Sequence, residues 1–304
     1  MLSFFPLVQS YLHTCEYQKN LSKMTVKAYR TDLLQFISFL ADDIPSKDVI
    51  KKYIDTLHLQ YKPKSVKRKI ASLKAFFNYL AEEELWDENP FSRLHICYKE
   101  PVILPKTIPM ETLQKLLSAM YHALNDGGLT SYKRRAIVLD ICVLELLFAT
   151  GMRVSELCNL RAEDIDLTSQ IVRIYGKGAR ERIMQIENAN VLTMLQEYRA
   201  QNHAAITACG FFFINRLGKR LSEQSVRNIL CVWTRRAKIT QHITPHMIRH
   251  TFATLLLEED VDIRYIQRML GHSSLITTQI YTHIAAAKQK QILATKHPRN
   301  RMVV

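Results

Sequence analysis

Apolar positions in the first 95 residues follow the three- and four-residue spacing of amphipathic helices. The clearest pattern covers residues 29–40, after a Ser/Thr capping signal, and a second covers residues 66–80. Shorter stretches near residues 3–18 and 46–59 have the same character. We therefore predict that residues 1–95 form a compact unit of four helices.

Several closely spaced prolines follow this unit. The residue before a proline avoids the helical conformation, so closely spaced prolines favour an extended chain. The dipeptides that carry this signal are Asn89-Pro90, Glu100-Pro101, Leu104-Pro105 and Ile108-Pro109. We predict a linker at 96–108 and a second domain at 109–304, which ends in a tail at 284–304.

The second domain has a mostly helical pattern with one exception. Met110–Ala123 has helical spacing, and the nearly all-apolar run Ile137–Phe148 is typical of a buried central helix. Ile171–Tyr175 and Arg182–Ile186 are β-rich and flank a glycine-containing turn, which indicates a hairpin. The predicted fold class is mainly α: a four-helix domain, then a mixed α/β, mostly helical domain with a small antiparallel β-hairpin or sheet.

Charge indicates the kind of partner. Lys and Arg number 42 against 28 Asp and Glu, a formal charge of +14 that favours nucleic acid, with an acidic membrane surface as the alternative. No apolar run approaches the roughly 18–20 residues of a bilayer span, and the start lacks the features of a signal peptide. The six cysteines include no C-x-x-C pair. We expect an intracellular, cytoplasmic protein without membrane partner, metal or disulfides.

Two helical segments concentrate positive charge. The first has five basic residues among eight positions at the start of a helix: Lys62, Lys64, Lys67, Arg68 and Lys69. The second lies on a helix opened by a serine: Arg227, Arg235 and Arg236. Both segments are suited to a phosphate backbone, although a solvated helix face is the more common reason for such a pattern. We keep both as candidate DNA contacts.

A further segment combines a helix start with residues suited to an anion. A Thr-Pro pair marks the start, so His246 and Arg249 fall one turn apart near the positive end of the helix dipole. His250 is also one turn from His246, which suggests a metal pair as an alternative. A zincin motif has glutamate where this chain has Met247, which argues against that alternative. Histidines that cap a helix within the core are another interpretation.

The remaining short motifs are ambiguous one by one. Arg153 and Glu156 follow a glycine turn after the apolar run and are compatible with a structural ion pair. Lys177 lies in the predicted hairpin turn. Leu270-Gly271-His272 ends a helix with glycine in the stop position. Tyr281 follows nine residues later, and such a tyrosine alone is more often a core aromatic than a nucleophile.

In their order along the chain, these motifs resemble the tyrosine recombinase/integrase family, which includes phage integrases, Cre and the Xer-type chromosome resolvases. The resemblance covers the larger domain, and the helical unit before it resembles the family's SAM-like core-binding domain. It implies a site-specific recombinase that cleaves and rejoins DNA through a covalent 3′-phosphotyrosine and a Holliday junction. Such an enzyme acts in DNA integration, excision or resolution.

The resemblance implies the groups that act on the phosphate. Arg153 and Arg249 would stabilise the negative charge on its non-bridging oxygens by bidentate hydrogen bonds. Lys177 would protonate the leaving 5′-oxygen, a role that requires a pKa lowered by the neighbouring arginines.

The resemblance also implies the nucleophile and its neighbours. Tyr281 would attack the phosphate, and His246 would help to deprotonate it. His272 would hydrogen-bond the scissile phosphate. Glu156 and His250 would support these side chains without touching the DNA.

The implied partner is a double-stranded DNA recombination site. A phosphotyrosine ester preserves the bond energy, so no cofactor is expected. A homotetramer would hold two duplexes, with or without a related recombinase or accessory factors, in the nucleoid. The tail 284–304 would dock on a neighbouring protomer or fold back in cis.

Two other functions fit part of the pattern. A catalytically silent DNA-binding architectural protein would keep the fold, but it would not need a tyrosine, a lysine and two arginines at one phosphate. A type IB topoisomerase-like relaxing enzyme would share the chemistry and differ in its products. The compact length favours an Xer-type or small mobile-element recombinase, and it leaves chromosome-dimer resolution and element movement both open.

Overall fold

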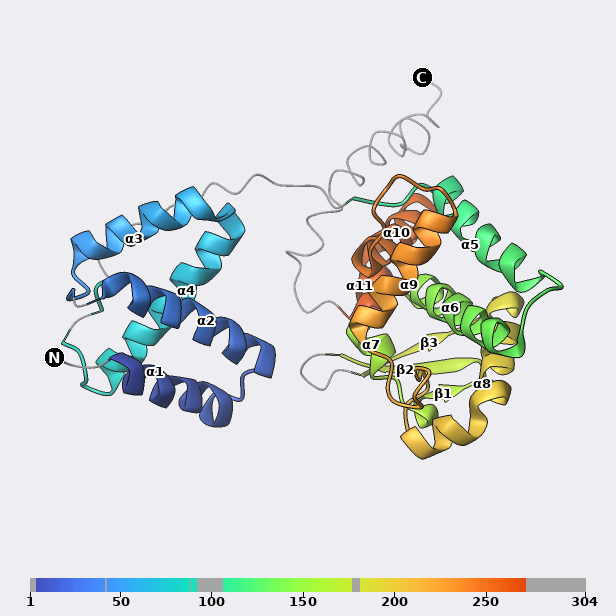
Figure 1. Ribbon diagram of the computed structural model, residues 1–304, viewed down its shortest axis with the longest axis horizontal. Helices are drawn as coiled ribbons and strands as arrows, with labels where there is room; N and C mark the ends of the chain where they lie inside the picture. The colour runs from blue at the N-terminus through green and yellow to red at the C-terminus, as the bar shows by residue number, and fades with distance from the viewer. Residues whose placement is uncertain (1–3, 42, 88, 92–105, 177–180, 272–304) are drawn as a thin grey trace, which may run out of the picture. The chain divides into compact units, whose positions relative to one another are not determined.

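The computed structural model describes residues 4–41, 43–87, 89–91, 106–176 and 181–271. The chain divides into two compact units, Met1–Ile103 and Leu104–Val304 (Figure 1). Among the described residues, no helix has the length and apolar character to cross a bilayer.

The first unit is built from helices. They are α1 (Phe4–His13), which continues into a short π-helix (Thr14–Gln18), α2 (Lys23–Leu40), α3 (Lys47–Gln60) and α4 (Pro63–Glu82). The predicted capping signal is present, because the Ser22 side chain accepts a hydrogen bond from the Thr25 backbone N–H. The four predicted helices are therefore confirmed.

A buried carboxylate links two helices of this unit. Asp32 of α2 is fully buried and accepts a hydrogen bond from Lys69 Nζ of α4 at 3.0 Å. It also accepts one from the Arg68 guanidinium and one from the Ser72 hydroxyl, at 3.2 Å for the hydroxyl. Since a buried charge is tolerated only when it is paired, this group fixes α2 against α4.

The second unit surrounds a central helix with further helices and a small sheet. Its elements are α5 (Met110–Leu124), α6 (Ser131–Thr150), α7 (Val154–Cys158), a 3₁₀ turn (Ala162–Asp164), β1 (Ile165–Asp166), β2 (Ile171–Tyr175), β3 (Glu181–Gln185), α8 (Ala189–Cys209), α9 (Glu223–Arg236), α10 (Pro245–Glu258) and α11 (Ile263–Leu270). The prediction of a mainly helical fold with a small antiparallel sheet is confirmed.

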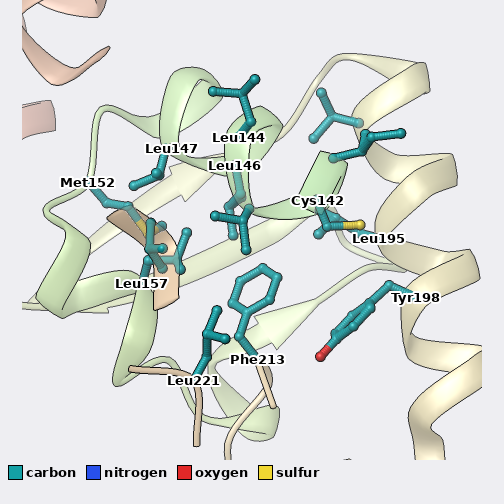
Figure 2. Close-up of a cluster of buried hydrophobic side chains, with 14 of the residues drawn as sticks. Cys142, Leu144, Leu146, Leu147, Met152, Leu157, Leu195, Tyr198, Phe213 and Leu221 are labelled. Atoms are coloured by element: carbon teal, nitrogen blue, oxygen red, sulfur yellow. The ribbon is translucent and has the colours of Figure 1, made fainter. Parts of the chain in front are cut away.

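The core of the second unit forms around α6, which packs against α5, α7, α8, α9 and α10. Its apolar run is buried, as predicted. Figure 2 shows Cys142 and Leu146 of α6 facing Leu195 and Tyr198 of α8, with the ring of Phe213 alongside. This rigid centre supports the turn at the C-terminal end of α6, where the candidate site begins.

The sheet has the antiparallel order β1-β2-β3, and its register sets which side chains face the core. Ile174 pairs with Arg182, and Tyr175 pairs with Glu181. Val172, Ile174 and Met184 are buried on one face, as the two-residue period of a strand requires. The β2–β3 hairpin was predicted, whereas β1 was not.

Candidate active site

Gly151 ends α6 and turns the chain toward Arg153. Its φ is +58°, a left-handed conformation, and its N–H bonds the Leu147 carbonyl oxygen at 3.0 Å. A Cβ at this position would lie 2.4 Å from the Phe252 ring. Because any side chain would meet both obstacles, glycine is required where α6 gives way to the Arg153 segment.

Arg153 caps α7 and is bound by Glu156 through two hydrogen bonds. The Arg153 N–H donates to Glu156 Oε2 at 2.8 Å, and Arg153 Nη1 donates to Oε1 at 2.7 Å. The Glu156 side chain is 5% exposed, while that of Arg153 is 35% exposed. The ion pair between Arg153 and Glu156 that the sequence suggested is present, and it leaves the Arg153 side chain accessible to a ligand.

Arg182 is a second cation on Glu156 that the sequence reasoning missed. From β3, its Nη2 donates to Glu156 Oε2 at 2.6 Å and its Nη1 to Oε1 at 3.2 Å. Burial alone would raise the pKa of Glu156, but the hydrogen bonds from Arg182 and Arg153 outweigh it and hold that pKa below its usual value. An arginine at an inward-facing position of the predicted strand was the available signal.

Arg249 joins two helix ends through its guanidinium. It is 5% exposed on α10, and its Nη1 donates to the Gly151 carbonyl oxygen at 2.7 Å. Its Nη2 donates to the Leu270 carbonyl oxygen, also at 2.7 Å. One side chain therefore fixes the end of α6, next to Arg153, and the end of α11, next to Gly271.

His246 lies at the start of α10 near these positive charges. Thr244 caps the helix by accepting the Met247 N–H at 3.3 Å, with proline at the first position as predicted. Burial lowers the pKa of His246, and the charges of Arg249 and Arg153 lower it further. The imidazole is consequently neutral at pH 7 and able to accept a proton.

His250, one turn further along α10, also has a lowered pKa. Burial is the main cause, followed by the charges of His246 and Arg249. Within the described ranges, no group of three or more His, Cys, Asp or Glu residues has the arrangement of a metal site. Lys177, His272 and Tyr281 lie outside the described residues, and their place in the site stays a prediction.

The candidate DNA contacts on α9 differ in their surroundings. Arg227 is exposed and donates to Glu223 at 2.9 Å, and its charge contributes to the lowered pKa of His246. Arg235 is exposed at the end of the helix. The Arg236 guanidinium lies 4.9 Å from the centre of the Trp233 ring.

The basic segment of α4 also divides into two kinds of residue. Lys62, Lys64, Lys67 and Arg68 are exposed. Lys69 is only 4% exposed, and its ammonium is bound to Asp32 and Gln35 inside the unit. Its assignment as a DNA contact is therefore corrected, because helix packing withdraws the charge from solvent.

Comparison with protein families gives two matches that together cover most of the chain. The model for the phage integrase family matches residues 111–288. The model for the phage integrase N-terminal SAM-like domain matches residues 8–84. The matched segments correspond to the two compact units.

Full-length relatives are similar along nearly the whole chain. A tyrosine recombinase from Agathobacter rectalis is 51% identical over 295 residues, which is 96% of each chain. Tyrosine recombinase XerC from Myxococcus xanthus is 34% identical and covers 98% of this chain and 100% of its own length. The similarity therefore includes both units and the segment between them.

Solved structures of recombinases share the fold. XerH bound to a palindromic difH substrate, in a post-cleavage complex, matches with a TM-score of 0.75 and 19% identity over 95% of this chain and 84% of its own. A lambda integrase tetramer bound to a Holliday junction matches with a TM-score of 0.66 and 15% identity over 90% and 78% of the two chains.

Proposed function

This chain belongs to the phage integrase family, and we propose that it acts as an Xer-like tyrosine recombinase with Tyr281 as its nucleophile. It is an enzyme that breaks and rejoins DNA at specific sites. The observation that carries the residue assignment is the convergence of three groups. Arg249 binds the carbonyl two residues before Arg153, and both arginines act on the pKa of His246.

The two arginines would stabilise the negative charge that develops on the phosphate during the reaction. Attack on a phosphodiester concentrates negative charge on the non-bridging oxygens, and guanidinium groups stabilise it best when they are held in place beforehand. Glu156 holds Arg153, and two backbone carbonyls hold Arg249. We assign both to the scissile phosphate.

The proton transfers complete the step. The Tyr281 oxygen forms a bond to phosphorus as the bond to the 5′-oxygen breaks. His246, neutral at pH 7, accepts the phenolic proton, and Lys177 donates one to the 5′-oxygen. His272 hydrogen-bonds the phosphate, and Glu156 and His250 support the site. Rejoining reverses each transfer, so the ester itself supplies the energy.

We propose two DNA duplexes and four protomers as the working assembly, because a lambda integrase of the same fold forms a tetramer on a Holliday junction. The exposed α4 residues and Arg227, Arg235 and Arg236 are the proposed backbone contacts. The proposed organisation is a core-binding domain at 1–95, a linker at 96–108 and a catalytic domain at 109–304. We place this activity at the cytoplasmic nucleoid.

A nicked suicide duplex tests the proposal. DNA from the flanks of the chain's own gene is incubated with wild-type protein, Tyr281→Phe and Tyr265→Phe, the last a matched change of an exposed tyrosine on α11. The wild type and Tyr265→Phe form an SDS-resistant protein–DNA adduct, and Tyr281→Phe does not. Specific DNA binding without any adduct would instead support the architectural protein, and DNA relaxation without strand exchange would support the topoisomerase-like enzyme.

A further inference from the structure

We propose that Arg182 is a positioning residue of the cleavage site. Through the Glu156 carboxylate, it orients Arg153 and keeps the positive charge of Arg153 available to the DNA phosphate. This inference rests on the proposed function, since it concerns the same phosphate.

The position of Arg182 in the sheet does not call for a charged residue. It pairs with Ile174, and the neighbouring inward positions Val172 and Met184 are buried and apolar. A buried ion pair is often no more stabilising than apolar side chains of the same volume. Packing alone therefore does not account for an arginine here, and the reason has to lie with its partner Glu156.

The contacts show how Arg182 controls the carboxylate. Each oxygen of Glu156 accepts one hydrogen bond from Arg182 and one from Arg153. The bidentate pair with Arg182 fixes the plane of the carboxylate. In that orientation one oxygen receives the Arg153 N–H while the other receives its guanidinium.

Charge gives Arg182 a second role. A pair of Arg153 and Glu156 alone would be neutral, and the carboxylate would compete with a DNA phosphate for the guanidinium. Arg182 adds one positive charge, so the three side chains together carry +1. Because Arg182 is 9% exposed and Arg153 is 35% exposed, Arg182 balances Glu156 from inside while Arg153 faces the ligand.

Arg182 also lies beside a third part of the site. A Cβ on Gly271 would lie 3.2 Å from Arg182 Nη1, and Gly271 has a φ of +63° at the end of α11. Arg249 binds the carbonyl of the preceding residue, Leu270. The end of α11 is thus bound by Arg249 and lies beside Arg182, which itself binds Glu156.

A methylphosphonate substrate separates this role from a general effect on folding. Replacing one non-bridging oxygen of the scissile phosphate with methyl removes its charge, so a residue that acts on this charge matters less. Single-turnover cleavage is measured for Arg182→Gln, Arg182→Lys and Arg153→Gln. The matched control is Arg173→Gln, an exposed arginine on β2 of the same sheet.

On the natural phosphodiester, Arg182→Gln is expected to slow cleavage by about 10²-fold, the lower end of the loss of a preorganised donor. On methylphosphonate the slowing falls below about tenfold, as it does for Arg153→Gln. Arg182→Lys keeps the charge without the bidentate geometry and lies between the wild type and Arg182→Gln. Arg173→Gln cleaves both substrates like the wild type.

A double-mutant comparison covers the case in which Arg182→Gln alone folds poorly. Glu156→Gln with Arg182→Gln removes both buried charges, and it is expected to cleave no more slowly than the slower single variant. Additive losses would reject action through Glu156.

Three further outcomes are diagnostic. Equal slowing of Arg182→Gln on both substrates would reject the proposal. Rescue of Arg182→Gln by a substrate with sulfur at the 5′-bridging position, without rescue by methylphosphonate, would also reject it. A sulfur leaving group needs no proton, so this result would connect Arg182 to proton donation and not to the phosphate charge. A wild type that forms no tyrosine adduct would instead reject the proposed function.

Discussion

In each unit of the molecule, a buried carboxylate lies between two cations. In the first unit, Asp32 binds Lys69, whose side chain is 5% exposed, and Arg68, which is 46% exposed. In the second, Glu156 binds Arg182, 9% exposed, and Arg153, 35% exposed. Both clusters therefore carry a net charge of +1 and turn one arginine toward solvent.

The two clusters differ in what surrounds them. Arg68 and Lys69 are neighbours on one helix, so with Asp32 they join α4 to α2. Arg153 and Arg182 come from separate elements, and Arg249 and His246 lie close by on α10. The same local electrostatics fixes a helix pair in one unit and, in the proposed mechanism, holds an arginine for the DNA phosphate in the other.

Removing the first carboxylate should have the largest effect. Asp32→Ala leaves Lys69 buried without its anion, which is expected to destabilise the first unit by about 3–5 kcal/mol. Urea unfolding followed by Trp86 fluorescence in a Trp233→Phe background reports on this unit. Asp48→Ala, at an exposed ion pair with Lys51, is the control and changes stability by less than about 0.5 kcal/mol. A loss for Asp32→Ala as small as that of the control would show that the buried cluster is dispensable.

Arg249→Lys changes a residue that lies beside the Glu156 cluster. A lysine keeps the charge but cannot bind the Gly151 and Leu270 carbonyls in the geometry of a guanidinium, so cleavage is expected to fall by about 10²–10³-fold. The control is Arg134→Lys, since Arg134 also binds a backbone carbonyl but lies away from the site on α6. Single-turnover adduct formation at saturating DNA measures both. Unchanged cleavage would remove Arg249 from the proposed mechanism.

Asp140 differs from Asp32 and Glu156, which bind cations, because its donor is a neutral group: it accepts the Trp233 indole N–H at 2.7 Å. Burial raises its pKa to about 6 against the lowering effects of Trp233 and Arg236. A folded pKa above the unfolded value gives a stabilising contribution that is full below about pH 4 and is lost as the pH rises through 6.

Asp140→Asn keeps the acceptor oxygen and removes this titration. The variant should therefore exceed the wild type in stability by roughly 2–3 kcal/mol at pH 8, and the difference should vanish near pH 4. Thermal unfolding at the two pH values measures the change. A difference that does not depend on pH would contradict it.

The smallest effect distinguishes exposed from buried lysines on α4. Lys64→Ala should weaken DNA binding by about 1 kcal/mol and reduce the slope of log K against log salt by about 1. Lys69→Met should leave that slope unchanged, because its ammonium is bound to Asp32. Salt titrations of DNA affinity decide this, and equal slopes for both variants would contradict the division.

Local sequence patterns were sufficient to predict most helices and strands. They were not sufficient to predict which side chains of different elements bind one another. The apolar run of α6, the capping serine of α2 and the β2–β3 hairpin follow from side chains close together in the sequence. β1 has two residues, too few for a periodic signal. Arg153 and Arg249 were candidates because their motifs are compact, and the structure places Arg249 on the Gly151 carbonyl, two residues before Arg153.

The residues that sequence reasoning misjudged depend on packing. Lys69 stands three residues after Val66 and four before Leu73, so its spacing placed it on the apolar face although its cluster suggested solvent. Strand alternation turns Arg182 inward, but only the tertiary fold brings it to Glu156, 26 residues away along the chain. A count of charges could find neither result.

The amino acid that becomes joined to DNA can be identified directly. Wild-type protein trapped on a nicked suicide duplex is digested with nuclease and trypsin, and the nucleotide-bearing peptide is sequenced by mass spectrometry. We expect attachment at Tyr281, the only tyrosine of the peptide Met269–Lys288. Attachment to a serine, a histidine or any other of the 13 tyrosines would contradict it.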